Sequence, residues 1–190
     1  MPKKQVNLLN MLGFILILAS LSMFWLTIGT RHRPEAPKRA LCFGNLKEFA
    51  LALAMYADRY DGRLPMDSVT PTLVGSMKLL SNVSNSAKFL HCPSDKRPGA
   101  KAEENFSKLT ISNISYSYVP NLIWQDAPDS IIAADRIYDT SAGTSWPQDG
   151  NHTYRGGGGH VLFNDGHVAF ESNLPSALKD KNGKQTVLSP

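Results

Sequence analysis

The sequence predicts an α+β protein, in which an N-terminal transmembrane helix precedes an amphipathic helix packed on a small antiparallel sheet. Three features support this prediction. Residues 8–28 form an uncharged apolar stretch, residues 40–60 carry apolar side chains at helical spacing, and short alternating segments lead to an Asp-Gly pair at residues 165–166. The helical and strand patterns occupy separate parts of the chain, which is typical of the α+β class.

The apolar stretch has the length of a membrane-spanning helix. About 20 apolar residues cross the hydrocarbon core as a helix, and only small or uncharged polar residues interrupt residues 8–28. Trp25 near the far end suits an interfacial anchor. A cleaved signal peptide is the alternative, but Gly29-Thr30-Arg31 does not match the small-residue cleavage pattern of such peptides. We therefore expect an uncleaved anchor.

The basic residues that flank this helix give conflicting indications of its orientation. Lys3 and Lys4 precede the helix, and four basic residues follow it within residues 31–39. Counting these charges favours a cytoplasmic C-terminal side, whereas a very short basic tail before a signal-like helix usually stays inside. We expect the amino terminus inside, and the rest of the chain on the periplasmic or external side of the cytoplasmic membrane.

An amphipathic helix is predicted after a short linker. Residues 31–39 form the linker because Pro34 and Pro37 interrupt a helix, and Pro37 also suits the first turn of the next one. That helix continues to the stop at Asp61-Gly62. Steps of three and four residues place its apolar side chains on one face, which we expect to cover a sheet. The stripe consists of Cys42, Leu46, Phe49, Leu53, Tyr56 and Tyr60.

About four short antiparallel strands follow in the prediction. Residues 89–95 resemble a strand that ends in a turn, residues 111–119 alternate in polarity up to Pro120, and residues 131–136 form a more buried strand. Residues 67–85 contain at most one short helix. The last strands form a hairpin within residues 160–171.

The hairpin is expected to turn at Asp165-Gly166, because this dipeptide is favoured in two-residue type I′ turns. Side chains alternate between the two faces of a strand, so this turn fixes which residues share a face. The apolar face would carry Val161, Phe163, Val168 and Phe170. The other face would carry His160, Asn164, His167 and Glu171, together with Leu162 and Ala169.

Composition limits the chemistry of the chain. Twenty basic and 16 acidic residues give a net charge of +4, and the basic residues do not alternate with aromatic ones, so nucleic acid is not an expected partner. Cys42 and Cys92 lack the spacing of a zinc ribbon. One disulfide or two buried thiols are both consistent with this pair, and an exported C-terminal part would permit the disulfide. We predict that Cys42 and Cys92 are bridged.

Five segments between residues 41 and 170 match a known family. They are Cys42-Phe43-Gly44-Asn45-Leu46-Lys47 with the helix that follows, Phe89-Leu90-His91-Cys92-Pro93-Ser94-Asp95, Ser115-Tyr116-Ser117-Tyr118, Ala133-Ala134-Asp135-Arg136, and Val161-Leu162-Phe163-Asn164-Asp165-Gly166-His167-Val168. In this order they resemble planctomycete-type pseudopilin-like proteins with a prepilin-type N-terminus and an H-X9-DG C-terminal motif. The resemblance implies a pilin-like head and a structural role related to type II secretion or type IV pilin-like assemblies.

The chain differs from the family pattern at two places. Residues 153–164 separate His152 from Asp165, which is three residues more than the motif has, because the Gly156–Gly159 run lengthens the loop. Prepilins carry a glutamate at the fifth position after the cleavage-site glycine, whereas Leu18 stands there after Gly13. A carboxylate inside a membrane helix is costly and retained for function. Its absence leaves N-terminal processing and polymerisation open.

Histidine and carboxylate side chains near the hairpin form the candidate site. The motif residues are His152, Asp165, Gly166 and His167, and the wider cluster adds Asp135, His160 and Glu171. Such side chains bind zinc and other transition metals, and aspartate with loop carbonyls binds calcium. The structural interpretation is that Asp165-Gly166 only forms the turn and that His152 hydrogen-bonds the loop. We assign no catalytic residue and no cofactor, and we keep His152, Asp165 and His167 as candidates for a metal site.

The predicted organisation has four parts, which are an anchor over residues 1–30, a linker over 31–39, a head over 40–171 and a polar tail over 172–190. We expect a membrane-anchored, non-enzymatic pseudopilin-like protein, with the membrane and other pseudopilin or secretion-system subunits as partners. The alternative is a membrane-tethered metal-binding protein or metal-dependent enzyme that uses the region of His152, Asp165 and His167.

Overall fold

A computed structural model describes residues 8–29, 35–68, 71–137, 146, 157–173 and 187–190. The chain divides into two compact units, residues 1–34 and residues 35–190. The second unit combines helices with a four-stranded antiparallel sheet of order β1-β2-β3-β4, which confirms the predicted α+β class. We refer to this second unit as the head.

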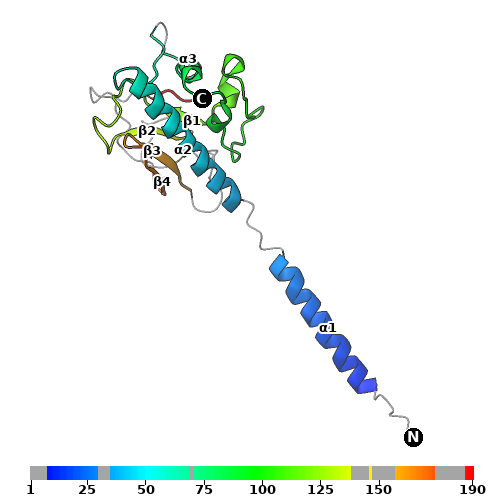
Figure 1. The fold of residues 1–190 in the computed structure, drawn as a ribbon. Helices are drawn as coiled ribbons and strands as arrows, with labels where there is room; N and C mark the ends of the chain where they lie inside the picture. Colours follow the sequence, from blue (N-terminus) through cyan, green and yellow to red (C-terminus); the bar gives the residue numbers. More distant parts are fainter. Residues whose placement is uncertain (1–7, 30–34, 69–70, 138–145, 147–156, 174–186) are drawn as a thin grey trace. The chain divides into compact units, whose positions relative to one another are not determined.

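Figure 1 labels the helices and strands of both units. The first unit contains α1 (Leu8–Gly29). The head contains α2 (Glu35–Arg59), α3 (Leu73–Lys78), β1 (Tyr116–Tyr118), β2 (Ile131–Asp135), β3 (Gly159–Phe163) and β4 (Val168–Glu171). Four short 3-10 turns, η1 (Leu79–Asn82), η2 (Lys88–Leu90), η3 (Phe106–Lys108) and η4 (Ile111–Asn113), lie in the connections. Residues 35–39, which we expected in the linker, are therefore already helical.

The side chains described in α1 run from Met11 to Met23, and nearly all of them are apolar and exposed. The hydroxyl groups of Ser20 and Ser22 donate to backbone carbonyls one turn earlier, over 2.8 and 2.9 Å. Such internal bonds satisfy the polar groups of a helix without water. At 1.5 Å per residue, the 22 residues of α1 extend about 33 Å, and a hydrocarbon core is about 30 Å thick.

By length and composition alone, one helix in the described part of the chain is long and apolar enough to cross a membrane. This helix is Ala36–Arg59 of α2, and 44% of its most apolar 18-residue stretch is buried. The Met11–Met23 segment of α1 is apolar but shorter. These helices are compatible with a single-pass membrane protein. The burial of α2 identifies it as the core helix of the head.

The predicted stripe of α2 forms the centre of the core. Its five members from Cys42 to Tyr56 are buried, and Tyr60 is half-buried. The helix packs on β3 and β4, and Figure 1 shows it crossing the sheet. It ends as predicted at Asp61-Gly62, where both residues have positive φ and the Gly62 N–H donates to the Ala57 carbonyl over 2.8 Å.

The sheet is a meander whose inner strand β2 is buried along its whole length. Residues 187–190 extend this sheet at the free edge of β1. Leu188 and Tyr118 exchange backbone hydrogen bonds of 2.8 and 2.9 Å, and the Ser189 hydroxyl lies 2.8 Å from that of Ser117. The last residues of the segment that we predicted as a polar tail therefore pack on the head. Residues 174–186 of that predicted tail lie outside the described residues.

Two predicted strands differ from the structure. The segment expected as a strand at residues 89–95 begins with the 3-10 turn η2 and continues as a loop with a turn at Pro93-Ser94. The strand expected over residues 111–119 is β1 only at residues 116–118, because Thr110 and Asn113 bond each other's backbone and cap η4. Local side-chain hydrogen bonds compete here with the sheet ladder.

The hairpin register that we predicted is wrong by one residue. The loop contains three residues, Asn164–Gly166, and Phe163 pairs with His167 through an N–H···O bond of 2.9 Å. Gly166 has a φ of +86°, as in a type I turn followed by a bulge. His160 consequently lies opposite Phe170 instead of Glu171. Since one residue of slip moves side chains to the other face, His160 and His167 do not share a face.

Candidate functional site

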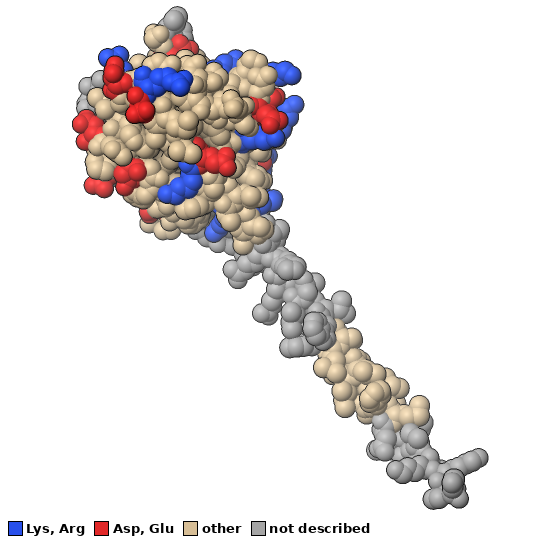
Figure 2. All heavy atoms as spheres, in the orientation of Figure 1, with Lys and Arg blue, Asp and Glu red and all other residues tan. Residues whose placement is uncertain are grey.

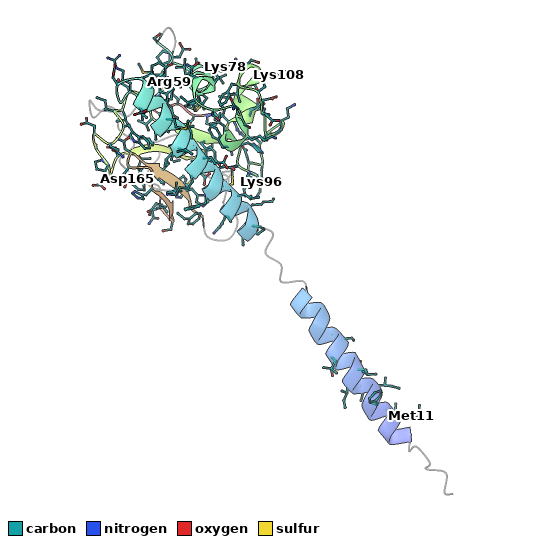
Figure 3. The ribbon with its side chains drawn as sticks, in the orientation of Figure 1. Met11, Arg59, Lys78, Lys96, Lys108 and Asp165 are labelled. Carbon is teal, nitrogen blue, oxygen red and sulfur yellow. A yellow bond between two sulfur atoms is a disulfide. The ribbon has the colours of Figure 1, made fainter. Side chains whose placement is uncertain are left out.

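The turn of the β3–β4 hairpin holds Asp165 and His167 side by side at the surface. Asp165 Oδ1 accepts a hydrogen bond from the His167 backbone N–H over 2.8 Å and lies 2.6 Å from His167 Nδ1. The His167 ring stacks on Phe163, with 4.1 Å between ring centroids. Figure 3 shows Asp165 at the edge of the head. The pair is thus fixed by local turn geometry, in which aspartate bonds the backbone two residues ahead.

Hydrogen bonding favours the charged form of Asp165. The His167 backbone N–H is the main cause that lowers the pKa of Asp165, and the His167 ring lowers it further. On the other side of the turn, Lys47 of α2 donates to the Gly166 carbonyl over 3.1 Å. Asn164 points inward, and its amide donates to the Ile123 carbonyl over 2.8 Å. The turn is therefore anchored to the head by two neighbouring segments.

This arrangement offers two potential metal ligands, whereas zinc sites use three or four protein ligands. In the described part of the chain, no group of three His, Cys, Asp or Glu residues is placed to hold a metal ion. His152 lies outside the described residues, so its approach to Asp165 stays a prediction. Glu171 and His160 lie at the other end of the hairpin, away from the turn, so they do not provide a third ligand beside Asp165 and His167.

A second polar pair is buried below the start of α2. His160 in β3 lies beside Asp135 in β2, whose Oδ2 accepts the His160 backbone N–H over 2.7 Å and is 3.0 Å from the ring Nδ1. The side chains of Phe43 and Phe170 contact the His160 ring edge to face. Tyr116 pairs with Asp135 across the sheet. One row across the four strands thus holds Tyr116, Asp135, His160 and Phe170.

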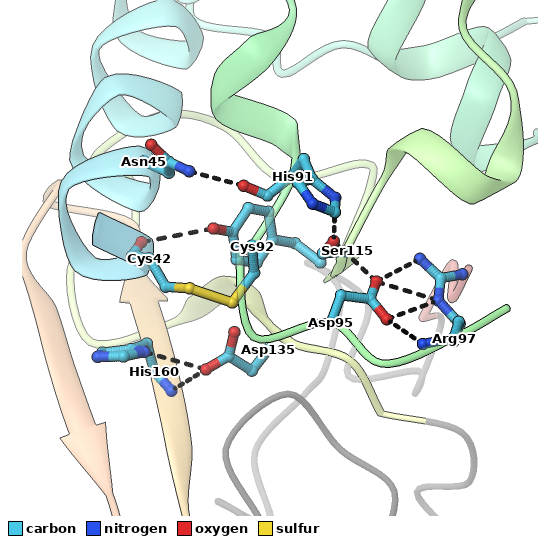
Figure 4. The surroundings of a disulfide bond; sticks show 10 residues. Cys42, Asn45, His91, Cys92, Asp95, Arg97, Ser115, Asp135 and His160 are labelled. Atoms are coloured by element: carbon cyan, nitrogen blue, oxygen red, sulfur yellow. Dashed lines mark hydrogen bonds and ion pairs between the residues drawn. A yellow bond between two sulfur atoms is a disulfide. The ribbon is translucent and has the colours of Figure 1, made fainter. Parts of the chain in front are cut away.

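A disulfide joins this region to the loop after η2. Cys42 and Cys92 are bonded, with their Cα atoms 5.0 Å apart, and both residues are buried. Figure 4 shows the contacts around it. The Asn45 side chain donates to the His91 carbonyl over 2.6 Å, and the Tyr116 hydroxyl donates to the Cys42 carbonyl over 3.4 Å. Burial raises the pKa of Tyr116 well above its ordinary value, so this hydroxyl keeps its proton.

A buried carboxylate, Asp95, stands three residues after Cys92. Arg97 donates to it from its backbone N–H over 3.0 Å and from its guanidinium over distances of 2.7 to 3.2 Å. Ser115 donates over 2.8 Å. Arg136, which is almost completely buried, forms an ion pair with Asp95 at 3.5 Å. Two cations and a hydroxyl therefore compensate one buried negative charge.

These contacts set the ionisation of the cluster. Burial of Asp95 opposes its charged form, but the hydrogen bonds from Arg97 and Ser115 together with the charge of Arg97 outweigh burial, so the pKa of Asp95 lies below its ordinary value. Burial also lowers the pKa of His91, which Asp95 raises and Arg97 lowers. The Ser115 hydroxyl lies 3.2 Å from His91 Nδ1. The cluster therefore holds an ionised carboxylate beside a histidine that favours its neutral form.

The structure brings together residues that the sequence analysis did not single out. Asp95 and Arg136 close two of the family-like segments, and Ser115 begins a third, yet only their contacts reveal a common cluster. One sequence feature indicates it, because Asp95 and Arg136 lie close after the apolar residues Phe89-Leu90 and Ile131–Ala134. A charge carried into the interior needs a partner of opposite sign.

Comparison of the chain with protein-family models, with curated proteins and with solved structures returned no match. The resemblance to pseudopilin-like proteins therefore depends on the residues of the five segments alone.

We predict that removing the disulfide destabilises the head substantially. The bond closes a loop over a sequence separation of 50 residues, and the chain-entropy relation gives about 4 kcal/mol for a loop of this length. Denaturant unfolding of the full chain in detergent should show this loss in the Cys42→Ala/Cys92→Ala double variant. Reductant should destabilise the wild type and leave the double variant unchanged. Two thiols labelled in denatured, unreduced protein would contradict the bond.

We predict that Asp95→Asn destabilises the head by about 3–5 kcal/mol, because it removes the buried charge that pairs with Arg97 and with the buried Arg136. The folded-state pKa of Asp95 lies below the ordinary value of 3.8, so the folded state binds fewer protons than the unfolded one in that range. The stabilisation is complete above pH 4 or so and disappears as the pH falls through the folded-state pKa.

Unfolding curves from about pH 2 to 6 should therefore depend less on pH in Asp95→Asn than in the wild type. Asp129 is exposed, and Asp129→Asn provides a matched control that should change stability by less than about 0.5 kcal/mol. Equal pH dependence in wild type and Asp95→Asn would show that Asp95 is not the group responsible.

Proposed function

We propose that this chain is a membrane-anchored, pseudopilin-like structural protein. In this proposal α1 spans the cytoplasmic membrane and the head lies on its periplasmic or external side. The head then serves as a subunit of a secretion- or pilus-type assembly, or as a component of the cell envelope. The observation that carries the proposal is an apolar 22-residue helix joined to a head that a buried disulfide closes.

The character of α1 supports the anchor. Large apolar side chains from Met11 to Met23 are exposed around the helix, and water solvates such a surface unfavourably. In lipid the same side chains lie in their preferred medium, and the two serines satisfy their hydroxyl groups within the helix.

The disulfide supports an external head. Disulfides persist in oxidising compartments such as the periplasm and are rare in the cytosol. The Cys42–Cys92 bond is fully buried and connects the core helix to a loop, which is the pattern of a structural bond. It favours the orientation with the amino terminus inside, against the count of flanking basic residues.

A structural role also agrees with how the head uses its polar groups. Asp95 is surrounded by Arg97, Arg136 and Ser115, and Asp135 bonds His160 within the sheet. Both carboxylates are buried and bonded to neighbouring protein groups. Carboxylates that are bonded in this way hold segments of the head together. Their hydrogen bonds and ion pairs are made to protein groups and not to a substrate.

A direct test measures where the protein lies in bacterial cells that express the full chain. We predict that it stays in the membrane fraction after alkaline carbonate washing, and that protease added to spheroplasts digests the head. Replacing Ile15 and Leu18 with arginine should release it, since each arginine at the centre of a span costs about 3 kcal/mol. Ile111→Arg/Ile123→Arg on exposed head positions is the control that should remain membrane-bound.

The mass of the mature N-terminus separates two forms of the proposal. A chain that begins at Met1 or Pro2 is a permanent anchor, whereas a chain that begins at Phe14 has been processed as a prepilin. Wild-type protein, with Ile15 and Leu18 unchanged, in the soluble fraction would contradict both forms.

The exposed Asp165–His167 pair keeps the metal-binding alternative testable. A structural head predicts no stoichiometric metal in the purified protein, because two ligands bind a cation weakly. Elemental analysis should compare the wild type with His152→Ala and His167→Ala. Stoichiometric metal that either substitution removes would favour the membrane-tethered metal protein. Loss of the metal in His152→Ala would also show that His152 reaches the turn.

A further inference from the structure

The core helix α2 has a second apolar face that the described head residues leave exposed. Its inner stripe fills the core, while Ala40, Gly44, Lys47, Glu48, Leu51 and Met55 all lie at the surface. We call these six residues the outer α2 stripe. Leu51 is 62% exposed and Met55 is 47% exposed. Figure 2, in the orientation of Figure 1, shows mainly uncharged surface over α2 with few charged groups in it.

Helical spacing aligns this stripe. Successive members are separated by steps of three or four residues, apart from the neighbouring Lys47 and Glu48, so they form one continuous band along the helix. The composition of α2 reflects this second band, because the helix is apolar enough to pass a membrane-span test although only 44% of its most apolar window is buried. An amphipathic helix that had only to cover its own sheet would carry polar residues along the whole of this band, whereas here only Lys47 and Glu48 are charged.

The outer α2 stripe is complementary to the same stripe of a second copy that runs antiparallel. Its first half contains the small residues Ala40 and Gly44, and its second half contains the large residues Leu51 and Met55. The two charged residues, Lys47 and Glu48, stand in the middle with opposite signs. A second copy that runs antiparallel therefore meets small residues with large ones and each charge with its opposite.

We propose that two copies of this chain pair through their outer α2 stripes as an antiparallel, two-fold symmetric dimer. The axis passes between Lys47 and Glu48, so that Gly44 contacts the partner's Leu51 and Ala40 contacts the partner's Met55. Lys47 then lies beside the partner's Glu48, and symmetry provides this ion pair twice. Large side chains of one helix fill the space that small residues leave on the other.

Two observations favour this arrangement over its alternatives. A parallel pair of helices would place Lys47 beside Lys47 and Glu48 beside Glu48, and like charges at an interface are unfavourable. At Gly44, an added Cβ would meet no atom within 4 Å, so the surface there is open to an approaching side chain. Lys47 already donates to the Gly166 carbonyl, and its ammonium group has two further hydrogens for a partner's carboxylate.

The inference uses only residues of the head and does not depend on the proposed membrane role. The proposed partner is a second copy of the chain, because the stripe is complementary in size and charge to an antiparallel copy of itself. Membrane fractionation and dimer formation are separate measurements, so either proposal can fail alone.

Cysteine cross-linking of the full chain in detergent tests the dimer and its register. The variant Gly44→Cys/Leu51→Cys should form a disulfide-linked dimer on mild oxidation, since these positions face each other across the axis. Within one helix they are seven residues apart, about 10 Å, which is too far for an intrachain bond. The native Cys42–Cys92 pair is buried and bonded, so the wild type should give no disulfide-linked dimer.

Matched variants decide the outcome. Gly44→Cys alone should not cross-link, and neither should Gly44→Cys/Asp58→Cys, which carries two exposed cysteines outside the register. In the cross-linking variant, Lys47→Glu should reduce the dimer about fivefold through loss of two surface ion pairs, and adding Glu48→Lys should restore it. Unchanged thermal unfolding of each variant excludes misfolding as the cause.

Three results would overturn the proposal. Cross-linking by Gly44→Cys alone would indicate a parallel pair, equal cross-linking by the out-of-register variant would indicate random collision, and a monomeric Gly44→Cys/Leu51→Cys variant would exclude the contact. Failure of Glu48→Lys to rescue Lys47→Glu would remove the charge pairing on which the register depends.

Discussion

The bond between Cys42 and Cys92 is the constraint on which the rest of the head depends. It fixes the second turn of α2 against the loop that follows η2, and this loop carries Asp95 into the interior. A buried carboxylate is tolerated only beside positive charge. Arg97 and Arg136 provide that charge from the same loop and from the end of β2. One covalent bond and one ionic cluster thereby hold helix, loop and sheet in a single arrangement.

The two constraints explain why the family-like segments lie where they do. Ser115 directly precedes β1 and places its hydroxyl on Asp95, Arg136 follows β2 with its guanidinium beside the same carboxylate, and His160 in β3 bonds Asp135. Polar side chains from three of these segments, and His160 just before the last one, therefore meet near the start of α2. Polar groups that are mutually satisfied specify a unique packing, which suits a head whose surfaces have to be presented reproducibly.

Helix α2 connects this interior to the surfaces of the molecule. Its inner stripe packs on β3 and β4, Lys47 reaches the hairpin turn at Gly166, and its outer stripe leaves Leu51 and Met55 exposed. A helix that is apolar on two faces is consistent with burial on both. A self-complementary contact through the outer stripe would place the rigid disulfide-bonded part of the head at the centre of a dimer.

The sequence by itself determined the features that depend on local periodicity. The apolar run, the inner stripe of α2, its stop at Asp61-Gly62 and the buried strand β2 all follow from spacing and turn chemistry. Only the tertiary structure decided the hairpin register, because a three-residue loop and a two-residue loop use the same Asp-Gly pair and differ by one residue of slip. The structure contains the Cys42–Cys92 bond that we predicted. The tertiary structure also decided which residues form the Asp95 cluster. Their partners lie far apart in the chain, and no local pattern encodes which distant charge compensates a buried one.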